Sequence, residues 1–122
     1  MDRTFFTLGS ISALISVAMG AFGAHGLRSR ISPEMLTVFE TGARYQMYHA
    51  LALLAVAWAY VHRQNSLTAW AGWAFVLGTV FFSGSLYILS ITGTRWLGAI
   101  TPIGGLLFLA GWFLLALSAW QK

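Results

Sequence analysis

The chain has no cysteine and few charged side chains, with seven Lys and Arg and three Asp and Glu among 122 residues. The lack of cysteine excludes a disulfide framework, a thiolate metal site and a cysteine nucleophile. Charged residues make up 8% of the chain and hydrophobic residues 58%, whereas about 25% are charged in ordinary soluble domains. A soluble domain needs more polar surface than this, so lipid is the predicted solvent.

Motifs of soluble enzymes are also missing from the sequence. It contains no glycine-rich phosphate loop after a strand, no nucleophile elbow and no HExxH pattern. The basic residues are scattered singly, a pattern that anchors helix ends at lipid headgroups and forms no nucleic-acid patch. We therefore expect no nucleic-acid partner and no enzymatic activity.

Long apolar runs dominate what is present. They predict membrane spans at about 5–26, 43–61, 67–91 and 98–120, within a single domain over residues 1–122. The first run is too long for the apolar region of a typical signal peptide. A tight polar turn at 62–66 makes the second and third spans antiparallel neighbours. The prediction is an all-α membrane protein whose four transmembrane helices form an up-down antiparallel bundle with both termini on one side.

The connection between the first two spans has a helical pattern of its own. Ser32 is suited to cap a helix, Pro33 to its first position and Glu34 to the positive end of its dipole. Apolar residues then fall on one face. A short helix lying in the membrane interface between spans one and two is expected, acting as a connector.

The second span begins with a polar segment, ETGARYQMYHALALL at residues 40–54. Four-residue spacing relates the members of two trios, each of which lines one flank of a helix: Glu40, Arg44 and Tyr48, and Thr41, Tyr45 and His49. Glu40 and Arg44 are expected to pair across one helical turn. The up-down topology places polar residues of other spans at the same end. We predict a binding or structural polar cluster formed by His25, Glu40, Arg44, Tyr45, His49 and Tyr87.

Four motifs carry a family resemblance across nearly the whole chain: GAFGAHGL at 20–27, ETGARYQMYHALALL at 40–54, FSGSLYIL at 82–89 and TPIGGLLFLAGW at 101–112. They resemble the YgdD family of small bacterial inner-membrane proteins with a domain of unknown function, which is similar to a eukaryotic four-span membrane protein. The resemblance implies a multi-pass protein of the bacterial inner (plasma) membrane and suggests cytoplasmic termini. It implies no activity.

Three functional interpretations stay open at this point. His25 and His49 are candidate ligands for a haem or metal, which would make the protein a redox component. An intramembrane ionisable cluster also fits proton or solute translocation by a small oligomer. The favoured prediction is a non-catalytic binding, accessory or structural membrane component, without a cofactor. Its expected partners are the lipid bilayer and other membrane-protein subunits or further copies of the chain.

Overall fold

Helices account for nearly all of residues 1–121, the part of the chain that the computed structural model describes, and no strand occurs in it. The elements in order are α1 (Asp2–Phe22), the π-helix η1 (Gly23–Leu27), α2 (Pro33–Arg63), α3 (Ser66–Thr92), the 3-10 helix η2 (Arg95–Ala99) and α4 (Thr101–Ser118). The predicted all-α class is confirmed.

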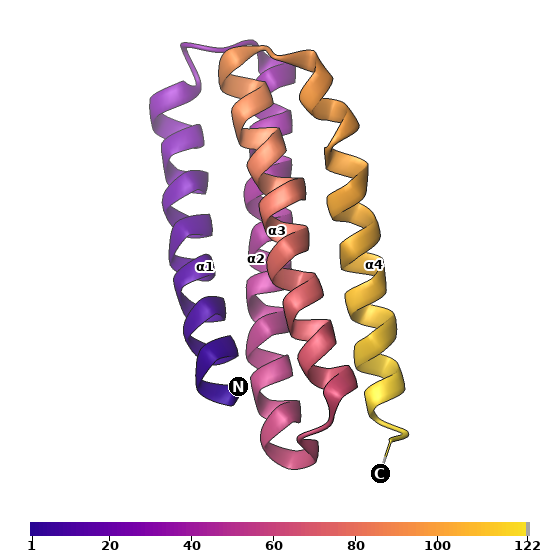
Figure 1. The fold of residues 1–122 in the computed structure, drawn as a ribbon. Coiled ribbons are helices and arrows are strands. Elements are labelled where there is room, and N and C mark those ends of the chain that lie inside the picture. Colours follow the sequence, from indigo (N-terminus) through magenta and orange to yellow (C-terminus); the bar gives the residue numbers. More distant parts are fainter. Residues whose placement is uncertain (122) are drawn as a thin grey trace.

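The four long helices run up and down in chain order (Figure 1). Helices α2 and α3 form the centre, α1 packs on α2, and α4 packs on α3, whereas α2 and α4 make few direct contacts. The start of α1 and the end of α4 lie at the same end of the bundle as the turn between α2 and α3 (Figure 1). This end is called the terminal end below, and the other is called the loop end.

Three segments are long and apolar enough to cross a membrane: Asp2–Leu27, Ser66–Thr92 and Arg95–Ser118. The first two of these segments contain the first and third predicted spans, and Arg95–Ser118 overlaps the fourth, predicted at 98–120. Helix α2 does not meet the same criterion, because its first half carries Glu40, Arg44, Gln46 and His49. Length and composition therefore give three candidate membrane-spanning helices.

The prediction of a separate interfacial helix between the first two spans is wrong. Residues 33–41 are the first turns of α2, which continues without a break to Arg63. The predicted start is correct, since Ser32 caps the helix by accepting a hydrogen bond from the Met35 N–H at 3.2 Å. No proline follows to end the helix, and Phe39 is fully buried against α1 and α3. Burial of this segment joins it to the bundle.

Local signals set the remaining helix ends. Gln64 adopts a left-handed conformation (φ 46°) that ends α2, and Asn65 caps α3 by accepting from the Thr68 N–H at 2.9 Å. The Asn65 amide also donates to the Ser118 carbonyl at 3.2 Å, which fixes the end of α4 to this turn. Pro102 lies in the first turn of α4, where proline is tolerated, so it starts the helix and does not kink it.

Small residues let α3 and α4 approach closely. The Gly104 Cα faces the backbone of Phe82, and a Cβ at this position would collide with it. A Cβ at Gly111 would lie 2.6 Å from the Phe75 ring. Because lipid provides no hydrophobic force between helices, close backbone packing of this kind is what holds them together. Phe75 and Phe108 belong to the main buried core, which also includes Phe5 of α1.

Candidate functional site

His49 is the most deeply buried of the predicted site residues, with 4% of its surface exposed. Its Nδ1 lies 2.8 Å from the carbonyl oxygen of Tyr45, one turn earlier in α2. The indole N–H of Trp112 in α4 points at Nε2 across 3.1 Å. A carbonyl oxygen only accepts and an indole N–H only donates. The imidazole proton is therefore on Nδ1, and Nε2 accepts from Trp112.

The faces of the His49 ring also pack against aromatic side chains. The ring stacks on Phe108 of α4, with centroids 3.5 Å apart and planes 5° from parallel. Phe75 of α3 lies 5.5 Å away, centroid to centroid. One imidazole thus joins three helices, and it supplies a hydrogen-bonded link between α2 and α4.

A groove of about 450 Å³ opens beside His49 between α2 and α4. We call it the aromatic groove, and it is lined by Tyr45, Tyr48, His49, Phe82, Gly105, Phe108, Leu109 and Trp112. No charged side chain lines it. Tyr45 and Tyr48 are 37% and 50% exposed, and their phenol groups have no hydrogen-bond partner within residues 1–121. The groove therefore combines flat apolar walls with two available hydroxyls.

Tyr87 belongs to a different network, which joins α1, α2 and α3. Its hydroxyl donates to Gln46 Oε1 at 2.6 Å. The Gln46 amide donates in turn to the carbonyl oxygen and the hydroxyl of Ser12 in α1, each at 3.2 Å. Two serine hydroxyls support the same helix contacts, since Ser16 donates to the Ala43 carbonyl and Ser83 to the Gly42 carbonyl, both at 2.6 Å. The geometry indicates that this network holds the bundle together.

His25 lies far from His49. It is exposed in η1, at the loop end. Gly9 of α1 faces Ala50, the neighbour of His49, with its Cβ position 2.8 Å from the Ala50 oxygen. His25 follows Gly9 by sixteen residues, which is about 24 Å along α1 at 1.5 Å per residue. The expectation that His25 and His49 approach each other is wrong, and the two side chains of one chain are too far apart to share a metal ion or haem iron.

Glu40 and Arg44 lie on the α1 side of α2, away from the aromatic groove. They line a separate groove of about 410 Å³ between α1 and α2. The expected ion pair between them is not formed. The one ion pair within residues 1–121 joins the N-terminal amine to Asp2. The six residues predicted as one cluster are thus distributed over several places: Tyr45 and His49 share the aromatic groove, Glu40 and Arg44 share the groove beside α1, and His25 and Tyr87 line neither.

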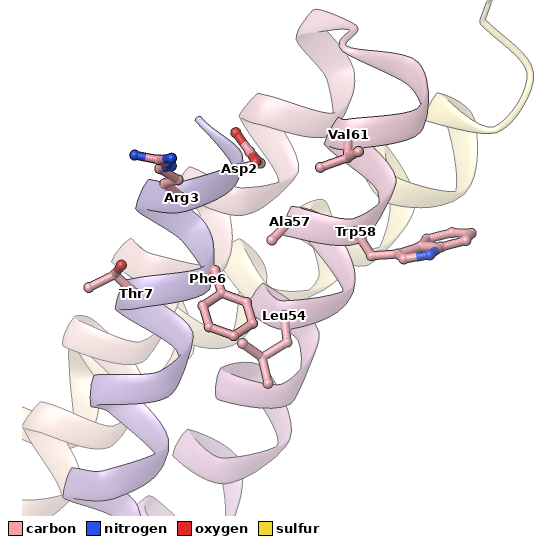
Figure 2. A pocket seen from close by; sticks show the side chains of 8 residues that line it. All are labelled: Asp2, Arg3, Phe6, Thr7, Leu54, Ala57, Trp58 and Val61. Carbon is pink, nitrogen blue, oxygen red and sulfur yellow. The ribbon is translucent and has the colours of Figure 1, made fainter.

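A third groove, of about 440 Å³, lies between α1 and α2 at the terminal end (Figure 2). Its walls are mainly apolar, and Asp2 and Arg3 lie at its outer edge, as Figure 2 shows. Arg3 points away from the apolar side chains of Phe6 and Leu54 in this view. We assign it no role.

Sequence reasoning missed two residues of these sites, Gln46 and Trp112. Gln46 falls between the two polar trios of α2 and so belongs to neither ladder. Its signal was an amide inside a predicted span, because a buried amide needs partners on neighbouring helices. Trp112 lies well inside the fourth apolar run, whereas interfacial tryptophans cluster at span ends. Its position was the available signal that its N–H has a partner in the bundle.

The side chains that line the aromatic groove are suited to apolar contacts and hydrogen bonds. Over the described range, no three His, Asp or Glu side chains are arranged to hold a metal ion. His49 has both ring nitrogens engaged in hydrogen bonds. The exposed parts of the groove are aromatic faces and two phenols, which bind by stacking and by single hydrogen bonds.

Several proteins similar to this chain are named as UPF0382 membrane proteins. A UPF0382 membrane protein of Staphylococcus haemolyticus is 49% identical over 120 residues, covering 98% of this chain and 97% of the relative. The UPF0382 membrane protein YwdK of Bacillus subtilis is 48% identical over 119 residues, covering 96% of each chain. No solved structure matches the chain.

The family comparison agrees with these relatives. A family model described as "Protein of unknown function (DUF423)" matches residues 19–105, a range that includes η1, α2, α3 and the aromatic groove's Tyr45, Tyr48 and His49. The predicted resemblance to a family of membrane proteins with a domain of unknown function is confirmed at this level. The chain is a transmembrane protein that belongs to the DUF423 family of proteins of unknown function.

Proposed function

We propose that this protein is a non-catalytic component of the bacterial plasma membrane that binds a flat, largely apolar ligand in the aromatic groove. The observation that carries the proposal is the Trp112–His49–Tyr45 hydrogen-bond chain, which holds α4 beside α2 and leaves a groove of about 450 Å³ next to it. Pockets of about 300–1,000 Å³ with apolar walls and a few polar groups are typical of small-molecule sites.

The membrane arrangement that we propose has four spans. Helix α2 crosses the membrane in addition to the three candidate segments. Arg44 and Arg63 are nineteen residues apart with no charged residue between them, which is about 28 Å at 1.5 Å per residue and matches a hydrocarbon core of about 30 Å. Helix α2 also packs between α1 and α3, both of which are candidate spans. The YgdD resemblance supports the plasma membrane as the location and the cytoplasm as the side of both termini.

The walls of the aromatic groove favour a ligand with a flat unsaturated ring. Phe82 and Phe108 lie 5.3 Å apart, centroid to centroid, and Tyr45 lies 4.9 Å from Phe82. Aromatic faces at such separations stack on flat rings more favourably than on flexible chains. Locking Phe108 under His49 keeps these faces in place before the ligand arrives, which lowers the entropy lost on binding.

The two phenols define where a polar end of the ligand would lie. Tyr45 and Tyr48 occupy the part of the groove nearest the loop end of α2 and are partly exposed. Phenol groups at this level can hydrogen-bond a carbonyl or hydroxyl of the ligand. The ligand class is therefore a ring-bearing lipid with one polar end, entering sideways from the bilayer.

The experiment that tests this proposal compares the small molecules that co-purify with three forms of the protein. The forms are the native chain, Gly105→Leu and the matched control Gly84→Leu, each extracted gently from its own membrane and analysed by mass spectrometry. A Cβ at Gly105 meets only the Phe82 ring, at 4.0 Å, and a Cβ at Gly84 meets nothing within 4 Å. The Cβ of a leucine at position 105 therefore fits without a clash, and the rest of its side chain occupies groove volume.

We expect one ring-bearing species at near-equal molar amount in the native protein and in Gly84→Leu, and its loss from Gly105→Leu. An identical set of bulk phospholipids in all three preparations would overturn the proposal. The groove would then be a packing seam between α2 and α4, and the role of His49 would be to hold the two helices together.

A further inference from the structure

The groove on the α1 side of α2 has a charge pattern that the aromatic groove lacks. We call it the Glu40–Arg44 groove. It has a volume of about 410 Å³ and is lined by Ser16, Val17, Gly20, Ala24, Glu40, Ala43, Arg44 and Met47. Arg44 is exposed and Glu40 partly so. Neither makes a side-chain hydrogen bond or an ion pair within the described part of the chain, so both charges are available to a ligand.

Arg44 lies beside Ser16, near the middle of the bundle, and its long side chain extends along α2 toward the loop end, where lipid headgroups lie. It lies about 28 Å along the helix from Arg63, which is at the terminal end. Trp58 and Trp70 are 61% and 64% exposed near that end, and Trp96 is 67% exposed at the loop end, as expected of aromatic residues at the two interfaces. An exposed arginine below the interface extends toward the lipid phosphates at the loop end, and the groove beside it lets a headgroup approach.

The groove presents its groups in the order of a phospholipid. Glu40 is nearest the loop end, Arg44 follows one helical turn deeper with Val17 of α1 at about its level, and Met47 lies deeper still. From water inward, phosphatidylethanolamine presents an ammonium group, a phosphate and then acyl chains. Residues four apart on a helix are neighbours about 6 Å apart, so one headgroup can reach both Glu40 and Arg44.

We infer that the Glu40–Arg44 groove is a binding site for the headgroup of phosphatidylethanolamine. Arg44 binds the phosphate, Glu40 accepts from the ammonium group, and the first part of an acyl chain lies along Val17 and Met47. The floor has room for it, because a Cβ at Gly20 would meet no atom within 4 Å. An anionic headgroup without an amine also places its phosphate on Arg44, but only its hydroxyls reach Glu40. A carboxylate binds an ammonium group more strongly than a hydroxyl, so Glu40 selects for the amine-bearing lipid.

This site is independent of the proposed ligand of the aromatic groove, which lies on the α4 side of α2. Its test is titration of delipidated protein in detergent with palmitoyl-oleoyl phosphatidylethanolamine or with phosphatidylglycerol of the same acyl chains, followed by native mass spectrometry. The variants are Arg44→Gln, Glu40→Gln and Gly20→Leu. The matched controls are Arg28→Gln, which removes an exposed cation at the same end, and Gly84→Leu.

The native protein is expected to bind the ethanolamine lipid about tenfold more tightly than the glycerol lipid, as one charge-assisted hydrogen bond provides. Arg44→Gln should weaken both lipids by about tenfold, since both carry the phosphate. Glu40→Gln should remove the preference and leave phosphatidylglycerol binding unchanged or stronger. Gly20→Leu should abolish the first bound lipid, and both controls should bind as the native protein does.

Equal affinity of the native protein for the two lipids would overturn the inference, as would equal effects of Arg28→Gln and Arg44→Gln. Those results would show general attraction of cations to lipid phosphates. If Arg44→Gln fails to fold, Glu40→Gln and Gly20→Leu carry the test, because neither removes a contact seen in the structure. Loss of the lipid preference in Glu40→Gln together with retained helix content by circular dichroism is the decisive result.

Discussion

The indole N–H of Trp112 donates to Nε2 of His49 across 3.1 Å and thereby joins α4 to α2. The two helices otherwise make few direct contacts. His49 passes the link on through Nδ1 to the Tyr45 carbonyl. One side chain in the second helix therefore sets the distance to the fourth, and with it the width of the aromatic groove.

The energy of this link can be measured with a double-mutant cycle of His49→Phe and Trp112→Phe. Phenylalanine keeps a flat ring at each position and removes the hydrogen bond. Hydrogen bonds between transmembrane helices contribute about 0.6 kcal/mol on average and up to about 1.7 kcal/mol. We expect a coupling energy at the upper part of this range, because His49 is buried, measured by reversible unfolding in sodium dodecyl sulfate mixed micelles. A coupling of zero would mean that the two rings only pack together.

The two histidines of the predicted cluster should behave as independent sites. His25→Ala and His49→Ala should have additive effects on the free energy of unfolding, because groups more than about 10 Å apart rarely couple and His25 lies about 24 Å along α1 from Gly9, which packs beside Ala50. His49→Ala should be destabilising and His25→Ala close to neutral. The loss of stability in the double variant would differ from the sum of the two single losses by about 1 kcal/mol only if the two histidines were in contact in the assembled protein.

Tyr87→Phe tests the network of α1, α2 and α3. The substitution leaves the Gln46 carbonyl oxygen without its 2.6 Å donor, and an unsatisfied buried acceptor costs about 1–3 kcal/mol. Tyr60→Phe is the control, since the Tyr60 hydroxyl has no hydrogen-bond partner within residues 1–121. The free energy of unfolding should fall for Tyr87→Phe and change little for Tyr60→Phe. Equal effects of the two substitutions would show that the Tyr87 hydroxyl adds nothing to the free energy of unfolding.

Gly104→Ala should loosen the contact between α3 and α4. The added Cβ would collide with the Phe82 backbone, and overpacking of a well-packed contact costs about 1–3 kcal/mol. Gly84→Ala adds the same atom in α3 where nothing lies within 4 Å. It should be neutral or slightly stabilising, because alanine favours helix over glycine. The thermal midpoints of the two variants in detergent provide the comparison, and a tolerated Gly104→Ala would contradict the packing shown here.

The side on which each loop lies can be determined cleanly because the chain has no cysteine. Ser29→Cys places a thiol in the connection before α2, and Ser66→Cys places one at the start of α3. If α2 crosses the membrane with cytoplasmic termini, an impermeant maleimide should label position 29 on intact cells. Position 66 should react only after permeabilisation. Labelling of both positions from one side would show that α2 does not cross.

The sequence by itself determined the solvent and the helical class. Low charge and long apolar runs leave few alternatives to helices in lipid, because every backbone polar group must be satisfied within the segment that crosses. Ser32 and Pro33 marked the start of α2 correctly, since capping is a local interaction. The sequence also singled out His49 and Tyr45, which line one groove in the structure, because polar side chains at the head of an apolar stretch stand out.

Only the tertiary structure decided which polar residues meet. The four-residue ladders of α2 are correct as spacings, but residues on one helix face different neighbours: His49 faces Trp112 of α4, Gln46 faces Ser12 of α1, and Arg44 lines the groove with α1. The register between helices is set by close contacts such as Gly9 on Ala50, and it separates His25 from His49. Such contacts join residues distant in the chain, so spacing along one helix cannot determine them.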